Sequence, residues 1–223
     1  TGFGCAGPGH GDGRPARQAC LNIPSGLALA GAGSLYIADS GHHAIRRLDA
    51  VTGIVSLVAG NYAAYYAGDG GPAAAAGINR PHAIVFDQAG NLLIADKGNH
   101  RIRRIAAATG IITTVAGTGF PTGSIDSPAG GDPRDDLADG APAVSASLNA
   151  PFGLAIDPAG NIYVGEMLNH RVRRIDAVTG IITTVAGNGS AGWGGDDIPA
   201  IEASLAGPAA LALDAGGNIY ISD

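Results

Sequence analysis

Short apolar runs separated by turn segments recur along the whole chain. In the clearest stretch, runs of five or six residues rich in Ile, Val, Leu and Thr occupy residues 83–87, 91–96, 101–106 and 111–116. Glycine-containing segments at residues 88–90, 97–99 and 108–110 separate them, as turns separate strands. No stretch has the length and 3.6-residue spacing of a helix, and the alanine-rich residues 72–76 allow one turn at most. The pattern therefore predicts an all-β chain.

The strands belong to a unit that is repeated along the chain. A proline followed by an apolar strand begins each unit, at Pro24, Pro81, Pro151 and Pro208, with spacings of 57, 70 and 57 residues. Four short strands per repeat, with a period above 50, are typical of the blade of a β-propeller. We therefore predict a single partial propeller, divided into a linker (1–23), blade units at 24–80, 81–150 and 151–207, and a truncated unit at 208–223. The middle unit carries an inserted loop at residues 118–139.

The two ends of the sequence suggest a fragment. Thr1 is not Met, and Asp223 falls within an apolar strand pattern. About three and a half blades are present, which cannot close a ring without leaving an unpaired edge. We expect the remaining blades, and any signal peptide, to lie outside this segment.

One segment carries a family resemblance. Residues 90–105, GNLLIADKGNHRIRRI, resemble the NHL repeat, which is named for an Asn-His-Leu signature. Residues 160–175 and 35–47 match it in the third and first units. The closing run at residues 109–117 and the linker at residues 68–72 look like those of bacterial, exported NHL proteins. The resemblance implies a propeller of four-stranded antiparallel blades, six in the closed parent, and an extracellular or periplasmic location.

Charge and composition exclude several classes of protein. Hydrophobic residues make up 46% and charged residues 14%, which excludes a polar disordered chain. No apolar run reaches the ~18–20 residues that cross a bilayer. With 13 basic and 19 acidic residues, a formal charge of -6 and a single lysine, Lys97, we expect no nucleic-acid partner. Eight of the arginines lie on the third strands, where we expect them to pair with carboxylates that end the second strands, such as Asp39, Asp96 and Glu166.

The head of the first strand of each unit is the candidate ligand site. Ser25, His82, Phe152 and Ala209 follow the anchoring prolines and are expected near a central channel. This resembles peptide-amidating lyases, NHL-type enzymes in which Pro-His at this place on several blades binds zinc. Zinc needs three or four protein ligands, and one of the four positions here is histidine. We therefore expect Ser25, His82 and Phe152 to line a channel rather than to hold zinc.

Three further histidines recur in register, at His43, His100 and His170. The repeat places one of them on each blade, so they are spread around the disc rather than gathered as metal ligands. We expect them to fix the turn or to pack between blades. Asp12, Asp69, Asp139 and Asp196 also recur and are read as turn residues, with calcium as the alternative.

The inserted loop and the cysteines give two more candidates. Asp132, Asp135, Asp136 and Asp139 crowd the loop, which is either a solvated acidic loop or a calcium or partner-recognition site. Cys5 and Cys20 are the only cysteines and lie in the first linker. They suit a local disulfide in an oxidising compartment, with two free thiols as the alternative.

The chain lacks the sequence signatures of common hydrolases. It contains neither a Gly-x-Ser-x-Gly elbow nor a His-Glu-x-x-His motif. We therefore expect a binding or scaffold propeller, without a cofactor, that presents loops to a protein, peptide or glycan. The alternatives are a metal-dependent lyase or hydrolase with its site over the channel, and a structural spacer in a larger surface protein.

Overall fold

The computed structural model describes residues 8–119 and 138–223, and their regular structure consists of β-strands and single turns of 3-10 helix. This confirms the all-β fold class. The short helices are η1 (Pro8–Gly11), η2 (Ala16–Gln18), η3 (Ser40–His42), η4 (Ala73–Ala75), η5 (Lys97–Asn99) and η6 (Ala143–Ser145). The alanine-rich segment thus forms η4, the single turn that its length allows.

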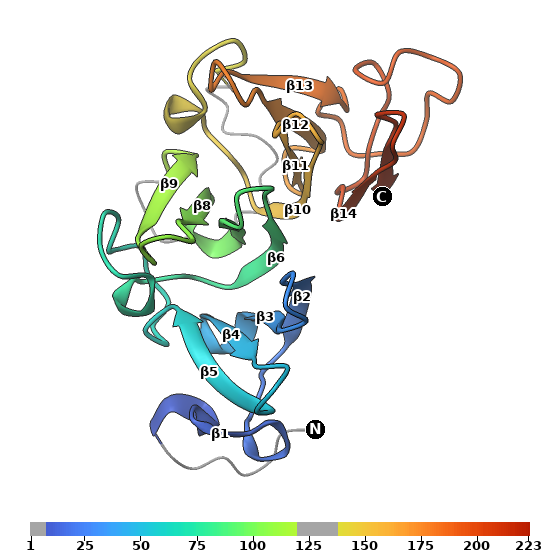
Figure 1. Ribbon diagram of the computed structural model, residues 1–223. Coiled ribbons are helices and arrows are strands. Elements are labelled where there is room, and N and C mark those ends of the chain that lie inside the picture. Colours follow the sequence, from blue (N-terminus) through green and yellow to red (C-terminus); the bar gives the residue numbers. More distant parts are fainter. Residues whose placement is uncertain (1–7, 120–137) are drawn as a thin grey trace. The chain divides into compact units, whose positions relative to one another are not determined.

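The strands form antiparallel sheets in which, apart from β1, neighbours in sequence are neighbours in space (Figure 1). The first sheet contains β2 (Pro24–Leu29), β3 (Leu35–Asp39), β4 (Ala44–Leu48) and β5 (Ile54–Ala59), with β1 (Arg14–Pro15) added beside β5. The second contains β6 (Pro81–Phe86), β7 (Leu92–Asp96), β8 (Arg101–Ile105) and β9 (Ile112–Ala116). The third contains β10 (Pro151–Ile156), β11 (Ile162–Glu166), β12 (Arg171–Ile175) and β13 (Ile182–Ala186). The last pairs β14 (Ala210–Leu213) with β15 (Ile219–Ser222).

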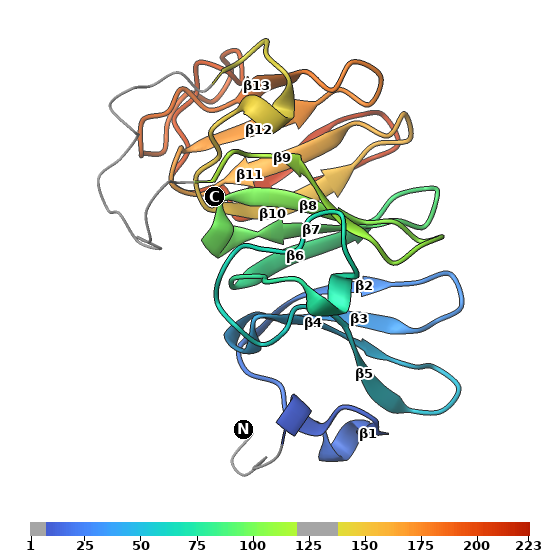
Figure 2. The same cartoon turned by 90° about the vertical axis from the view of Figure 1, so that its left-hand side faces the viewer.

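Each of the three larger sheets has the meander order of a propeller blade, with short hairpin turns between its strands (Figure 2). The prediction of four-stranded antiparallel blades is confirmed, whereas the boundaries of the repeat units stay a prediction. Two compact units divide the chain and are described separately. The first ends at Asn99 and adds Arg103–Thr113, and the second comprises His100–Ile102 and the chain from Thr114.

The segment that precedes each blade runs along the outer strand of that blade. We call residues 10–20, 67–77 and 138–147 the straps. The amide N–H groups of Gly13, Gly70 and Gly140 each donate, at 2.8 Å, to a carbonyl of the adjoining outer strand, on Val55, Ile112 and Ile182. The strap thereby pairs the otherwise unpaired edge of the sheet.

The core of the first unit lies between its sheets and the second strap. Ile45, Ile78, Ile94 and Ile112 are fully buried there, each contributing about 1.5–3 kcal/mol relative to exposure. Small residues, Ala38 and others, allow the sheets to approach each other closely.

The first strand of a unit is less buried than its apolar composition predicts. All residues of β7 are buried, whereas in β6 only Pro81 and Ile84 are buried and the other four residues are half-buried. The reason is that β6 is the edge strand of its sheet, while β7 has hydrogen-bonded neighbours on both sides.

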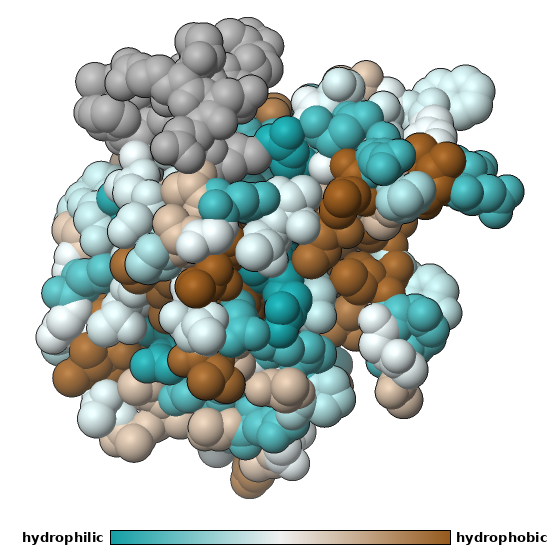
Figure 3. All heavy atoms as spheres, turned by 90° about the horizontal axis from the view of Figure 1, so that it is seen from above, coloured by the Kyte–Doolittle hydropathy of each residue, from teal (hydrophilic) through white to brown (hydrophobic). Residues whose placement is uncertain are grey.

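Large apolar side chains are exposed on the first and last strands. Leu27 and Leu29 of β2 are 62% and 70% exposed, and Tyr220 of β15 is 59% exposed. Figure 3 shows hydrophobic side chains lying among hydrophilic ones at the surface seen from above. Within residues 8–119 and 138–223, no helix is long and apolar enough to cross a membrane.

Candidate functional site

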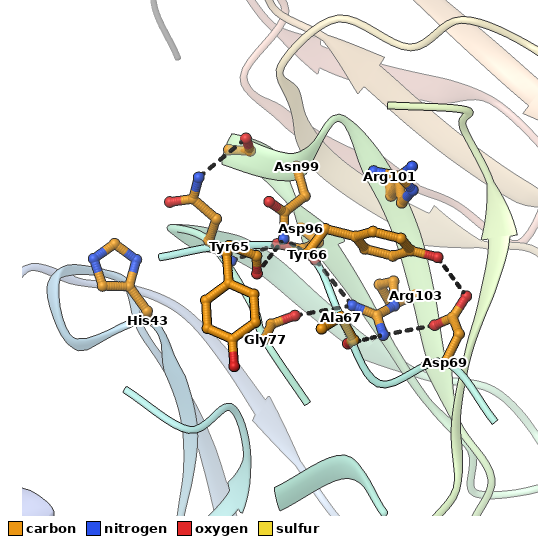
Figure 4. Close-up of polar contacts among 12 residues, drawn as sticks. His43, Tyr65, Tyr66, Ala67, Asp69, Gly77, Asp96, Asn99, Arg101 and Arg103 are labelled. Carbon is orange, nitrogen blue, oxygen red and sulfur yellow. Dashed lines mark hydrogen bonds and ion pairs between the residues drawn. The ribbon is translucent and has the colours of Figure 1, made fainter. Parts of the chain in front are cut away.

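One arginine in each complete blade is fully buried between two carboxylates. Arg103 lies 3.3 Å from Asp96, which is also fully buried, and 2.6 Å from Asp69, whose side chain is 30% exposed (Figure 4). Nη1 and Nη2 also donate to the carbonyls of Gly77 and Ala67, respectively. The predicted pairing of second-strand carboxylates with third-strand arginines is confirmed, and Arg46 and Arg173 repeat it with Asp39 at 3.3 Å and Glu166 at 3.4 Å.

The sequence did not predict that a second carboxylate, from the strap, pairs with each buried arginine. Asp12, Asp69 and Asp139 lie 2.6 Å from Arg46, Arg103 and Arg173. The sequence indicates turn residues here, with calcium as the alternative; Asp69 does lie in a turn, and its carboxylate, like those of Asp12 and Asp139, pairs with a guanidinium group. A constant separation of 34 residues between aspartate and arginine was the available signal.

Burial and hydrogen bonding oppose each other at the buried carboxylates. Complete burial raises the pKa of Asp96 to about 6, although the Asn79 amide, Asn99 and Arg103 all donate to it. Burial likewise raises the pKa of Glu166. Because these groups are enclosed by framework donors, they hold the blade together and are closed to a substrate.

The recurring histidines brace one blade against the next. The backbone N–H of Arg80 donates to Nδ1 of His43 at 3.1 Å, and that of Ala150 donates to Nδ1 of His100 at 3.0 Å. All three histidines have positive φ angles, of 50–54°, at the turn before the third strand. The predicted structural role is confirmed for His43 and His100. Burial, followed by the charge of Arg80, lowers the pKa of His43, which favours the neutral acceptor.

The structure brings two of the predicted channel residues together. Ser25 and His82 lie on the adjacent strands β2 and β6, where the Ser25 hydroxyl donates to the His82 carbonyl at 3.1 Å. Register shifts at the starts of β2 and β6 mark β-bulges at these positions. Phe152 lies at the equivalent place on β10, in the second unit. A channel role for the three residues stays a prediction.

The acidic and cysteine candidates fall largely outside the described residues. Asp132, Asp135, Asp136 and Cys5 lie there. Both oxygens of Asp139 accept hydrogen bonds, from Arg173 and from the Thr184 amide. Burial pushes the pKa of Asp139 up, but the bonds from Thr184 and Arg173 outweigh it and leave the pKa below its ordinary value.

Cys20 is buried and disulfide-bonded. Because Cys5 lies outside the described residues, the pairing of Cys20 with Cys5 stays a prediction. In the part of the chain that the structure describes, no three His, Cys, Asp or Glu residues are grouped so that they could hold a metal.

A tyrosine-rich loop in the first unit was not anticipated. Residues 61–69 follow β5 and run into the second strap, and Tyr65 and Tyr66 are 46% and 40% exposed there. Asn61 donates to the Tyr65 hydroxyl at 2.5 Å, and the Tyr66 hydroxyl donates to Asp69 at 2.9 Å. The Arg103 guanidinium lies 5.0 Å from the centre of the Tyr66 ring.

The loop is also held by its backbone. Asn99 donates to the carbonyl of Tyr65 at 3.1 Å, and isolated bridges join Ala64 to Ile78 and Ala67 to Gly77. Figure 4 shows both rings beside the buried network of Arg103. The loop therefore offers aromatic surface that is already ordered before any ligand binds.

Comparison with known proteins agrees with this architecture. The model of the NHL repeat matches residues 21–48 and 79–105, and the chain is 32% identical, over 70% of its length, to NHL repeat-containing protein 2 of Bos taurus. The chain belongs to the NHL-repeat β-propeller family. It is also 28% identical over its whole length to Protein SUPPRESSOR OF QUENCHING 1, chloroplastic, of Arabidopsis thaliana. This NHL chain spans about a fifth of the length of these curated relatives, 20% and 21%.

Solved structures share the fold of the NHL chain at low sequence identity. A protein of unknown function from Bacteroides thetaiotaomicron matches 91% of this chain and 45% of its own, with a TM-score of 0.67 and 19% identity. An auxiliary nutrient binding protein from Bacteroides ovatus matches 92% of this chain and 46% of its own, with a TM-score of 0.62 and 21% identity. A streptogramin B lyase matches 89% and 47%, with a TM-score of 0.52 and 14% identity.

Proposed function

We propose that this NHL chain is a non-catalytic recognition module, which binds a protein, peptide or glycan partner through the loops between its blades. The observation that carries the proposal is the ordered loop at residues 61–69, whose tyrosine rings are exposed while their hydroxyl groups are engaged within the protein. Exposed aromatic rings of fixed orientation bind partners at low entropic cost. The nutrient-binding neighbour offers a precedent for a binding role on this fold.

The charged side chains of the blades support the same view. The buried arginines and their carboxylates are committed to the framework, and His43 and His100 are committed to the contact between blades. His82 at the head of β6 is a candidate for chemistry, and the lyase neighbour supports metal-dependent catalysis over the channel as the second candidate function. The disulfide at Cys20 supports an oxidising compartment, such as the extracellular space or the periplasm.

The test is a binding screen with paired variants. The full-length protein and its Tyr65→Ala/Tyr66→Ala variant are screened on glycan and peptide arrays, with Val51→Ala, a change at an exposed hairpin tip, as the control. We expect the tyrosine variant to lose binding by tenfold or more, since aromatic hot spots contribute at least ~1–2 kcal/mol each. Binding that survives in the tyrosine variant would reject this loop as the site. Stoichiometric zinc in the protein purified without chelator, lost on His82→Ala, would favour the enzyme instead.

A further inference from the structure

The rim of the first blade departs from the repeat at several positions that meet in space. His42 stands where the other two blades carry Asn99 and Asn169. In the first strap, His10 stands where the second strap carries Ala67. Tyr62 stands where the later loops carry Gly119 and Gly189. The other blades therefore lack this arrangement of side chains.

The substituted side chains form a stack that joins the first strap to the blade. The rings of His10 and His42 lie 3.8 Å apart between centroids, at 28° to each other. The ring of Tyr62 lies 4.8 Å from that of His10, on the side of the loop after β5. The two ends of the first strap meet at His10, because the Cys20 amide donates to the His10 carbonyl at 3.0 Å.

Two carboxylates, two guanidinium groups and a further histidine lie near the stack. Nδ1 of His42 lies 2.9 Å from the fully buried Asp39, and Arg46, fully buried in β4, bridges Asp39 to Asp12 of the strap. The Tyr62 hydroxyl donates to Asp12. His43 and Arg80 lie beyond His42. Arg46 balances one of the two carboxylates. A proton added to His10 is therefore repelled by a second imidazole and a guanidinium, and the two carboxylates oppose that repulsion only in part.

We infer that the His10–His42 stack is a proton-sensitive clasp, which holds the first strap against its blade at neutral pH and releases the strap on acidification. In the closed arrangement, burial, then the neighbouring His42 and Arg46, lower the pKa of His10, against the opposing effect of Asp39 and Asp12. A strap that has come away from the blade exposes His10 to water, where the ordinary pKa of 6.5 applies. Protons therefore bind better to the open state as the pH falls below 6.5.

The pH dependence of strap opening follows from the difference between the pKa of His10 in the closed and in the open strap. The ordinary imidazole pKa sets an upper limit of about 30-fold on the rise of the opening equilibrium between pH 8 and pH 5, which is reached when His10 stays neutral throughout in the closed clasp. The second strap provides an internal reference, because residues 67–77 make the equivalent backbone bonds without either imidazole. Its opening should show no rise as the pH falls, because the raised pKa of Asp96 beside it favours protonation of the closed state rather than the open one.

The experiment is hydrogen exchange on the full chain at several pH values between 5 and 8, corrected for intrinsic exchange. Peptides spanning residues 10–20 should show faster opening as the pH falls, by up to ~30-fold, whereas those spanning residues 67–77 should show no rise. His10→Phe keeps an aromatic ring on His42 but cannot bind a proton, so it should stay closed at both extremes. His42→Asn restores the residue of the other blades and should reduce the rise at least threefold. A rise of equal size in both straps, or a rise that persists in His10→Phe, would overturn the inference.

Discussion

Removing the guanidinium of Arg103 is the sharpest test of how the blades are held together. The side chain is fully buried, and Arg103→Met would leave Asp96, also fully buried, without its counter-charge. Breaking a buried pair in this way costs about 3–5 kcal/mol. We expect the lower end, about 3 kcal/mol, because Asp96 keeps hydrogen bonds from the Asn79 amide and from Asn99. Asp69 regains water at the rim and adds little.

The assay is urea unfolding of the full chain at pH 7, followed by circular dichroism. The neighbouring Arg104→Met is the matched control, since Arg104 is exposed and its loss should change the free energy of unfolding by less than about 0.5 kcal/mol. The double variant Arg103→Met/Asp96→Asn should be more stable than the sum of the two single changes predicts, because no lone charge stays buried. Equal midpoints for Arg103→Met and Arg104→Met would refute the argument.

Two further predictions concern the contact between blades. Gly26→Ala places a Cβ against the His82 carbonyl and should lower the free energy of unfolding by about 1–3 kcal/mol. The control, Gly31→Ala, places a Cβ with nothing within 4 Å and should leave the free energy of unfolding unchanged. Equal urea midpoints for the two variants would contradict this prediction. The lowered pKa of His43 means that the unfolded chain binds its proton better, so this stabilisation is complete above about pH 6.5 and declines as the pH falls. The acceptor bond from Arg80 is lost on protonation, and His43→Asn should flatten the dependence of the urea midpoint on pH.

Much of the fold follows from local sequence patterns. Alternating apolar runs, glycine turns and a repeated proline were enough to predict four-stranded antiparallel blades, because strand and turn preferences act over a few residues. Pairing of Arg103 with Asp96 was also predictable, since neighbouring strands of a hairpin place such residues side by side. The same reasoning assigned His100 to a structural role, which its bond from the Ala150 amide confirms.

Contacts between segments that are distant in the sequence were not predicted from local patterns. Asp69 joins Arg103 because the strap folds back along the outer strand; the constant separation of 34 residues hints at a relation, but strand and turn preferences do not predict that path. For the same reason the tyrosine loop went unnoticed: the exposure of Tyr66 depends on the hydroxyl and backbone bonds that hold it open. A repeat predicts what every blade shares. The stack of His10 on His42, which one blade alone forms among the described residues, arises where the chain departs from its repeat, and tertiary structure decides whether such departures meet.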